Sequence, residues 1–358
     1  MWPDRRILDL FKIELPIVQA PMAGVMDAEL VIAAAQAGAL GSLPCAMLTA
    51  EKAREQVNII RQRVSAPVHM NFFCHKQLAS DAAREAGWKQ RLAPYFKELG
   101  LDPAAPINAP NRAPFDEAMC EAVEELQPEV VSFHFGLPER GLLRRVKAAG
   151  CVVMAAATTV KEAVWLEDNG ADVIIAQGAE AGGHRGMFLT ENIGEQPGTF
   201  ALVPQIVDAV KAPVIAAGGI ADGRGIAAAF ALGAAGVQIG TAYLRCPESR
   251  VSAPGRAALS QGTDESTVIT NVMTGRPARG IANRLMREVG PISSDAPVFP
   301  HAATALAPLK AAAEKLGKID FSNVWAGQAV RLGQDMPAAE LTRTLASDAL
   351  ARMAKLAG

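Results

Sequence analysis

Residues 169–184 read NGADVIIAQGAEAGGH and hold a helix end, a strand and a glycine-rich turn in one short stretch. Gly170 followed by a small residue is typical of the left-handed position that closes a helix. The apolar run after it predicts a strand over 172–176 with both faces buried, as in a parallel sheet. The glycines of 178–184 exclude a helix interior and predict a loop lying against a flat ligand.

The same order of glycine, small residue and apolar run recurs at Gly38, Gly150 and Gly233. Other apolar runs begin with proline, which a strand tolerates at its first residue. Amphipathic helices lie between the runs, for example over 50–64. Together the runs predict eight strands over 17–20, 39–42, 67–71, 129–133, 151–156, 172–176, 213–217 and 236–240.

Strand and helix alternate in a pattern that predicts an α/β fold, a TIM (β/α)8 barrel, in residues 1–243. A doubly wound open sheet is the alternative that periodicity leaves open. Residues 72–128 are longer than a βα connection needs and predict extra helices over the barrel mouth. Residues 244–320 carry no repeated strand phrase, which predicts a mostly helical second lobe on the substrate side of the mouth. Residues 321–358 predict two C-terminal helices that return to the barrel.

The composition excludes several classes of protein. With 50% hydrophobic residues and a net charge of -2, the chain is neither disordered nor suited to general electrostatic binding of nucleic acid. It has no apolar run long enough to cross a membrane, and its first residues lack the apolar core of a signal peptide. The 5 cysteines are widely spaced and odd in number, which predicts free thiols in the cytoplasm.

The active site of a TIM barrel lies at the carboxyl ends of its strands. Gly218 and Gly219 follow the seventh predicted strand, and Gly240 and Thr241 follow the eighth. Their backbone N–H groups and the threonine hydroxyl predict a phosphate cradle. Tight βα turns are the plain alternative. No G-x-G-x-x-G motif follows the first strand, so a Rossmann nucleotide site is not indicated.

Four further strand-end residues predict chemistry. His184 ends the glycine-rich loop, and its ordinary pKa of about 6.5 suits removal of a proton. His134 ends the fourth strand and is a second candidate for contact with substrate. Asn71 and Gln177 present amide groups, which suit the edge of a flavin ring. The strand ends offer no nucleophile elbow, no paired carboxylates and no set of metal ligands.

Five motifs resemble those of the nitronate monooxygenases, formerly called 2-nitropropane dioxygenases. They are QAPM at 19–22, HMN at 69–71, GAEAGGH at 178–184, AGGI at 217–220 and QIGT at 238–241. Single motifs are shared with flavin-dependent enoyl and quinone reductases. The pair of His134, within SFHFG, and His184 points to the nitronate branch.

The resemblance implies a TIM barrel that holds FMN without a covalent bond. It implies His184 as the catalytic histidine, with His134 beside it, and no metal. A small-molecule nitronate and O2 are the implied partners, and a homodimer is left open. The flavin contacts carried over by motif or expected from the phosphate cradle are Ala20, Pro21, Met22, Asn71, Gln177, Gly182, Gly218, Gly219, Gln238, Ile239, Gly240 and Thr241.

The implied reaction converts an alkyl nitronate and O2 to a carbonyl compound and nitrite, with propionate 3-nitronate and nitroalkanes among the candidate substrates. If neutral nitroalkanes are used, His184 also removes the α proton. Two other functions stay open. One is an NAD(P)H-dependent FMN reductase of a quinone or an enoyl thioester on the same barrel. The other is a flavin-binding barrel without enzymatic activity.

One segment departs from the pattern of the family. Bacterial relatives are expected to carry tyrosines and a lysine near the substrate, but residues 297–304 read PVFPHAAT, and no lysine precedes Lys310. The nearest cations in sequence are Arg276, Arg279 and Arg284. Simple alkyl nitronates are therefore expected to serve about as well as propionate 3-nitronate.

Overall fold

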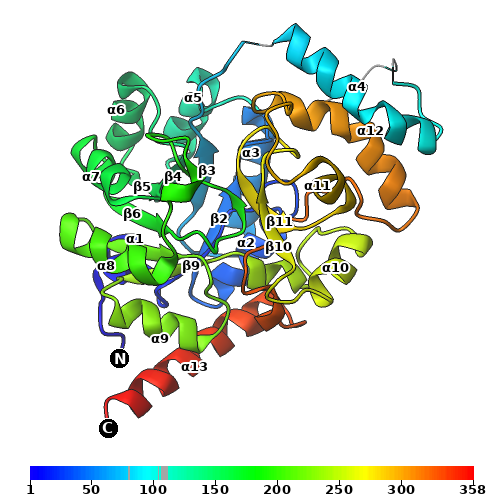
Figure 1. Cartoon of the computed structure of the whole chain (residues 1–358). Helices are drawn as coiled ribbons and strands as arrows, with labels where there is room; N and C mark the ends of the chain where they lie inside the picture. Colours follow the sequence, from blue (N-terminus) through cyan, green and yellow to red (C-terminus); the bar gives the residue numbers. More distant parts are fainter. Residues whose placement is uncertain (80, 104, 106–111) are drawn as a thin grey trace.

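Eight parallel strands close into a barrel in the computed structural model, which describes residues 1–79, 81–103, 105 and 112–358 (Figure 1). The barrel closes where Ile17 pairs with Val237. This closure confirms the TIM barrel and excludes the open sheet. The strands match the predicted ones to within two residues: β1 (Ile17–Gln19), β2 (Leu40–Pro44), β3 (His69–Phe73), β4 (Val130–His134), β5 (Val152–Ala157), β6 (Val173–Gln177), β8 (Val214–Ala217) and β9 (Gly236–Ile239).

Helices cover the outside of the barrel, and most begin at a side-chain cap. Asp27, Thr49 and Asp222, for example, each accept a hydrogen bond from the first turn of the helix that follows. The predicted helix over 50–64 is confirmed. The barrel helices are α1 (Arg6–Phe11), α2 (Ala28–Gln36), α3 (Ala50–Arg63), α5 (Glu117–Leu126), α6 (Arg140–Ala148), α7 (Val160–Asp168), α8 (Thr199–Ala209) and α9 (Gly223–Ala231).

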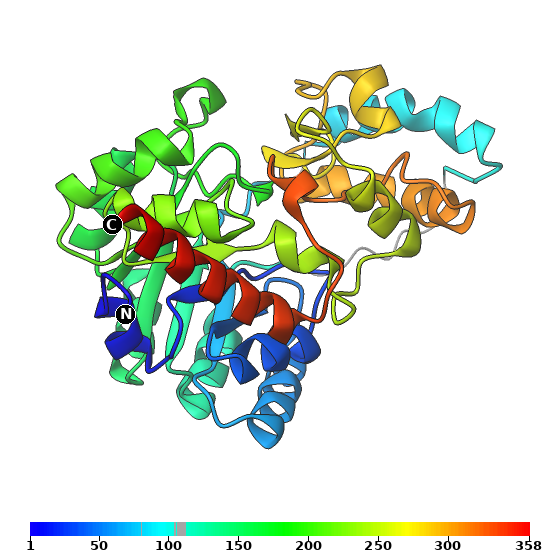
Figure 2. The same ribbon diagram turned by 90° about the horizontal axis from the view of Figure 1, so that it is seen from below.

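A second lobe lies beside the barrel mouth and has its own apolar core (Figure 2). Trp88 and Leu92 of one helix pack there against Leu306 and Phe321. The lobe is built from α4 (Ala82–Glu98), α10 (Ala253–Ser260), β10 (Thr267–Thr270), β11 (Ala278–Ile281), α11 (Arg284–Val289) and α12 (His301–Lys315).

The lobe differs from the prediction in two ways. It contains the short strands β10 and β11, which form a three-stranded sheet with β7 (Gly183–His184). Of the extra helices predicted over 72–128, α4 packs against α12, whereas α5 belongs to the barrel. Residues 104 and 106–111 of that segment lie outside the described residues. The residues of β7, β10 and β11 lie outside the alternation of strand and helix from which the barrel strands were predicted.

The C-terminal segment holds one helix where two were predicted. Residues 321–329 have no helix, and a single 3-10 turn, η3 (Val330–Leu332), precedes α13 (Ala338–Leu356). This last helix packs against α9 and α2, and the Tyr243 hydroxyl lies 2.7 Å from the Thr342 hydroxyl. Residues 321–329, here called the crossing segment, form neither helix nor strand and contribute to the lining of the cavity at the barrel mouth.

Two buried arginines bind three consecutive carbonyl groups after the end of β6. Arg185 donates to the carbonyl oxygens of Gln177 and Gly178, at 2.8 Å each. Arg279, on β11, donates to the next carbonyl oxygen, that of Ala179, at 2.8 Å. Arg185 is fully buried, and its third bond goes to the Gln196 amide oxygen at 2.6 Å. We call this pair of side chains the arginine clamp. It supplies hydrogen-bond donors to the carbonyl groups of a turn that is not paired with a strand or helix.

We expect Arg185→Met to lower the free energy of unfolding by about 2–4 kcal/mol. Each buried acceptor left unsatisfied costs roughly 1–3 kcal/mol, and relief of the buried charge offsets part of that cost. Urea unfolding followed by circular dichroism measures the change. The matched control is Arg224→Met, because the Arg224 side chain is 61% exposed and pairs with Asp222 at the surface. Equal losses in both variants would contradict a structural role for the clamp.

Candidate active site

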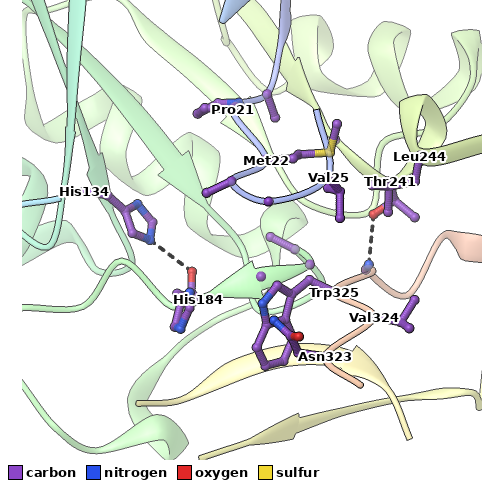
Figure 3. Close-up of a pocket in the computed structure, with 18 of the residues that line it drawn as sticks. Pro21, Met22, Val25, His134, His184, Thr241, Leu244, Asn323, Val324 and Trp325 are labelled. Carbon is purple, nitrogen blue, oxygen red and sulfur yellow. Dashed lines mark hydrogen bonds between the residues drawn. The ribbon is translucent and has the colours of Figure 1, made fainter. Parts of the chain in front are cut away.

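A cavity of about 520 Å³ opens at the carboxyl ends of the barrel strands, between the barrel and the second lobe (Figure 3). All but one of the predicted site residues line this cavity: Ala20, Pro21, Met22, Asn71, His134, Gln177, Gly182, His184, Gly218, Gly219, Gln238, Gly240 and Thr241. The exception is Ile239, whose side chain is buried in the barrel core.

The predicted phosphate cradle has open backbone donors. Gly218 and Gly219 have φ values of 113° and 71°, in the region that favours glycine. No hydrogen bond joins the N–H groups of Gly219 or Gly240 to another described residue. The Thr241 hydroxyl oxygen accepts from the Gly327 N–H at 2.9 Å, so the crossing segment is tied to this corner.

The amide side chains at the strand ends are held in different ways. Asn71 donates to the Ser132 hydroxyl at 2.8 Å, which turns its amide nitrogen toward the barrel. The buried His69 bridges the hydroxyls of Ser42 and Ser132 at 2.6 Å each within the barrel. The Gln238 amide oxygen is buried without a partner among the described residues.

These features fit a flavin that carries a phosphate. Unpaired N–H groups at the ends of β8 and β9 suit a phosphate group. The unpartnered oxygen of Gln238 suits a donor on a ligand, because a buried acceptor is otherwise costly to leave unpaired. In the described part of the chain, no group of three or more His, Cys, Asp or Glu side chains is placed to hold a metal ion.

The Thr274 hydroxyl contacts one ring nitrogen of His184. It lies 3.0 Å from Nε2 and 3.3 Å from the Arg276 carbonyl oxygen. When the hydroxyl donates to that carbonyl, its oxygen accepts from Nε2–H and Nδ1 is unprotonated. Withdrawal from bulk water lowers the pKa of His184 well below 6.5, and the charge of Arg112 lowers it further.

His134 and Gln177 hold the backbone of His184. Both donate to the His184 carbonyl oxygen, His134 through Nε2 at 3.1 Å and Gln177 through its amide nitrogen at 3.0 Å (Figure 3). The Gln177 amide oxygen accepts from the Gly186 N–H at 2.7 Å. Burial lowers the pKa of His134 to about 4, so its ring is neutral near pH 7.

The crossing segment forms a wall of the cavity that the sequence did not predict. Asn323 and Trp325 lie on it beside His184, and the rings of Trp325 and His184 are 5.5 Å apart (Figure 3). A Cβ on Gly182 would lie 2.6 Å from the backbone of Ala326, so that glycine is required for the close approach. The glycine was visible in the sequence, but its partner was not.

The segment 297–304 contributes an apolar wall, as predicted. Pro300 lines the cavity, and Phe299 is buried with its ring 5.4 Å from that of His184. Lys310 also lines the cavity, bonded to the Asn323 amide oxygen at 3.2 Å. No tyrosine of the described residues lines the cavity.

The three arginines nearest in sequence do not line the cavity. Arg276 lies over the Phe135 ring at 4.0 Å and donates to the Met187 carbonyl. Arg279 belongs to the clamp, and Arg284 pairs with Glu98 on the second lobe. Arg112 lines the cavity instead. Sequence reasoning missed it because its segment has no strand or helix to place it.

Comparison with known proteins identifies the family of the chain. The family model described as nitronate monooxygenase matches residues 4–348. The chain is 42% identical to a nitronate monooxygenase of Pseudomonas aeruginosa over 347 residues, 96% of this chain and 98% of that one. It is 41% identical to a nitronate monooxygenase of Paraburkholderia phytofirmans over 343 residues, 95% and 94% of the two chains.

The structure is also similar to that of a nitroalkane oxidase from Streptomyces ansochromogenes. The TM-score is 0.88 and the identity 36%, over 98% of this chain and 99% of that chain. None of the helices in the described residues has the length and apolar character that crossing a membrane requires. The family match spans the barrel, the lobe and most of the last helix, so the chain belongs to the nitronate monooxygenase family and is a flavin-dependent oxidoreductase of nitronates.

Proposed function

We propose that the flavin of this enzyme is FMN and that His184 is the base for neutral nitroalkanes. The observation that carries the cofactor is the set of unpaired backbone donors at Gly219 and Gly240, which suits one phosphate. The unpartnered amide oxygen of Gln238 supports a ring seated beside it. Bound flavin accepts the electrons that the nitronate gives up, which the protein side chains cannot do.

His184 supplies the proton chemistry in this proposal. Its Nδ1 takes the α proton of a nitroalkane, and the electrons of the broken C–H bond form the C=N bond of the nitronate. Thr274 keeps the other ring proton on Nε2, while His134 and Gln177 hold the backbone in place. These contacts hold the imidazole of His184 in the orientation that proton removal requires.

The aromatic residues around His184 exclude water from the reacting carbon. Phe73, Phe299 and Trp325 each place a ring centre within 6.0 Å of the imidazole. An apolar wall strengthens electrostatic interactions inside the cavity and protects reactive intermediates from hydrolysis.

The cellular location of the enzyme is also part of this proposal. The 5 cysteines are free, and four are buried, which supports a cytoplasmic enzyme.

An anaerobic mixture of the holoenzyme with NADH distinguishes a reductase from a nitronate oxidase. We expect the flavin absorbance to persist with NADH and to bleach with a nitronate.

The purified protein should carry one FMN per chain, and Gly219→Val should lose it because the side chain fills the phosphate space. Gly317→Val is the matched control, since Gly317 has a φ of 74°, close to the 71° of Gly219, and nothing within 4 Å of its added Cβ. Absorbance and chromatography of the released flavin measure content and identity. Release of FAD, or equal flavin content in the two variants, would contradict the cradle.

His184→Asn should lower turnover of neutral nitroethane by about 10²–10⁴-fold, the usual effect of losing a general base. Turnover of pre-formed ethyl nitronate should fall less, because its proton is already gone. Nitrite release at fixed oxygen measures both, with His301→Asn, outside the cavity lining, as the control. Equal losses on the two forms would assign His184 to positioning instead.

The pH dependence of nitroethane turnover should have its acid limb below 6.5, the ordinary pKa of histidine. His184 acts as a base only when neutral. Because burial depresses its pKa, the ring stays neutral as the pH falls, and kcat/KM drops only when the pH passes through the depressed value. An acid limb centred at or above 6.5 would contradict the burial of this group.

A further inference from the structure

Arg112 is a cation on the cavity wall for which the described part of the chain supplies no partner. It is half-buried, and burial lowers the pKa of its guanidinium. Among the described residues, no carboxylate forms an ion pair with it and no side chain or carbonyl accepts a hydrogen bond from its guanidinium. A buried charge is costly unless something compensates it, so the missing anion is the feature to explain.

The other arginines near the site are all occupied. Arg185 and Arg279 bind the carbonyls of the clamp, and Arg276 binds the Met187 carbonyl. Lys310 shares the cavity wall with Arg112 but is bonded to Asn323. Arg112 therefore differs from its neighbours in having all of its donors available to a ligand.

The nearest acid on the cavity wall does not compensate this charge. Glu314 lines the same cavity, and its carboxylate accepts from the Ser322 hydroxyl at 2.7 Å. Ser322 belongs to the crossing segment and Glu314 to α12, so their bond ties those two elements together. No carboxylate of the described residues pairs with Arg112, so a bound molecule is the candidate source of the anion.

Arg112 and His184 line the same cavity, so an anion bound at Arg112 lies in the space that the proposed base faces. Of all the charged groups around His184, Arg112 has the largest effect on its pKa, ahead of His134, Arg276 and His75. A molecule whose reacting carbon faces His184 thus has its anionic oxygens within the field of Arg112. A guanidinium binds two such oxygens at once in a planar fork.

We propose that Arg112 is a specificity-determining residue that binds an anionic oxygen pair of the substrate. The proposal rests on the proposed placement of substrate at His184. Two groups supply this chemistry: the nitronate itself, or a carboxylate further along the same molecule. Both are planar and carry their charge on two oxygens.

The experiment compares two substrates across four forms of the holoenzyme. The substrates are propyl 1-nitronate and propionate 3-nitronate, which share the reacting group and differ in the carboxylate. The forms are wild type, Arg112→Gln, Arg112→Lys and, as the matched control, Arg287→Gln, because Arg287 is exposed and donates only to the Ala282 carbonyl. Nitrite release at fixed oxygen gives kcat/KM, and flavin content shows that each variant is loaded.

We expect Arg112→Gln to lose about 10- to 100-fold in kcat/KM, as for loss of charge-assisted hydrogen bonds. Arg112→Lys should lose less, since it keeps the charge but not the fork. Equal losses on both substrates identify the nitronate as the bound group. A loss confined to propionate 3-nitronate identifies the carboxylate. Values for Arg112→Gln within twofold of wild type on both substrates would overturn the proposal.

A second measurement needs no variant. Propionate and propionamide have the same shape, and only the first is an anion. Inhibition of the wild-type holoenzyme against propyl 1-nitronate should be at least 10-fold tighter for propionate. Equal inhibition by propionate and propionamide would overturn the proposed recognition of an anion. Nitrite release by the wild type would still support the proposed function in that case. Absence of nitrite release from either nitronate would instead reject the proposed function.

Discussion

The geometry of the site depends on the hydrogen bonds of the arginine clamp. A parallel strand that ends at a barrel mouth leaves carbonyl groups that no neighbouring strand pairs, and buried carbonyls require donors. Arg185 and Arg279 supply those donors from outside the barrel ring. The turn after β6 is thereby fixed, and the loop that carries His184 leaves it in one direction. The clamp thus connects the barrel to the three-stranded sheet of the lobe.

The crossing segment completes the site by close backbone contact. Gly182 and Gly280 have no side chains at the points where residues 324–327 approach, and a Cβ on either would lie under 3.0 Å from that segment. The Ile281 N–H donates to the Val324 carbonyl at 2.8 Å, and the Gly327 N–H donates to Thr241. Barrel, lobe and crossing segment therefore hold one another around the cavity without any covalent link.

The barrel was predictable because most strands follow one of two local patterns, a glycine with a small residue or a proline before an apolar run. The candidate residues then followed from the fold: Asn71 lies in β3, Gly219 lies two residues after β8, and His184 lies in the loop region after β6. The missing parts depend on contacts between distant segments. Trp325 reaches the cavity only because residues 324–327 fit against glycines far away in sequence. His184 belongs to a two-residue strand whose partner lies about 90 residues further along, and no local pattern reveals such a pairing.

The division of the cavity between two lobes separates two kinds of evolutionary change. The residues proposed to bind flavin and to remove the proton lie at the ends of the barrel strands and in the loop after β6. The arginine clamp fixes the backbone of that loop, so few substitutions are expected there. The cations and rings that face the outer part of the cavity, Arg112, Lys310 and Trp325, come from segments outside the barrel ring. Substitutions there can retune selectivity while the chemistry is inherited unchanged, as TIM barrels generally permit. Paralogues that diverge in these outer segments should catalyse the same reaction on different substrates.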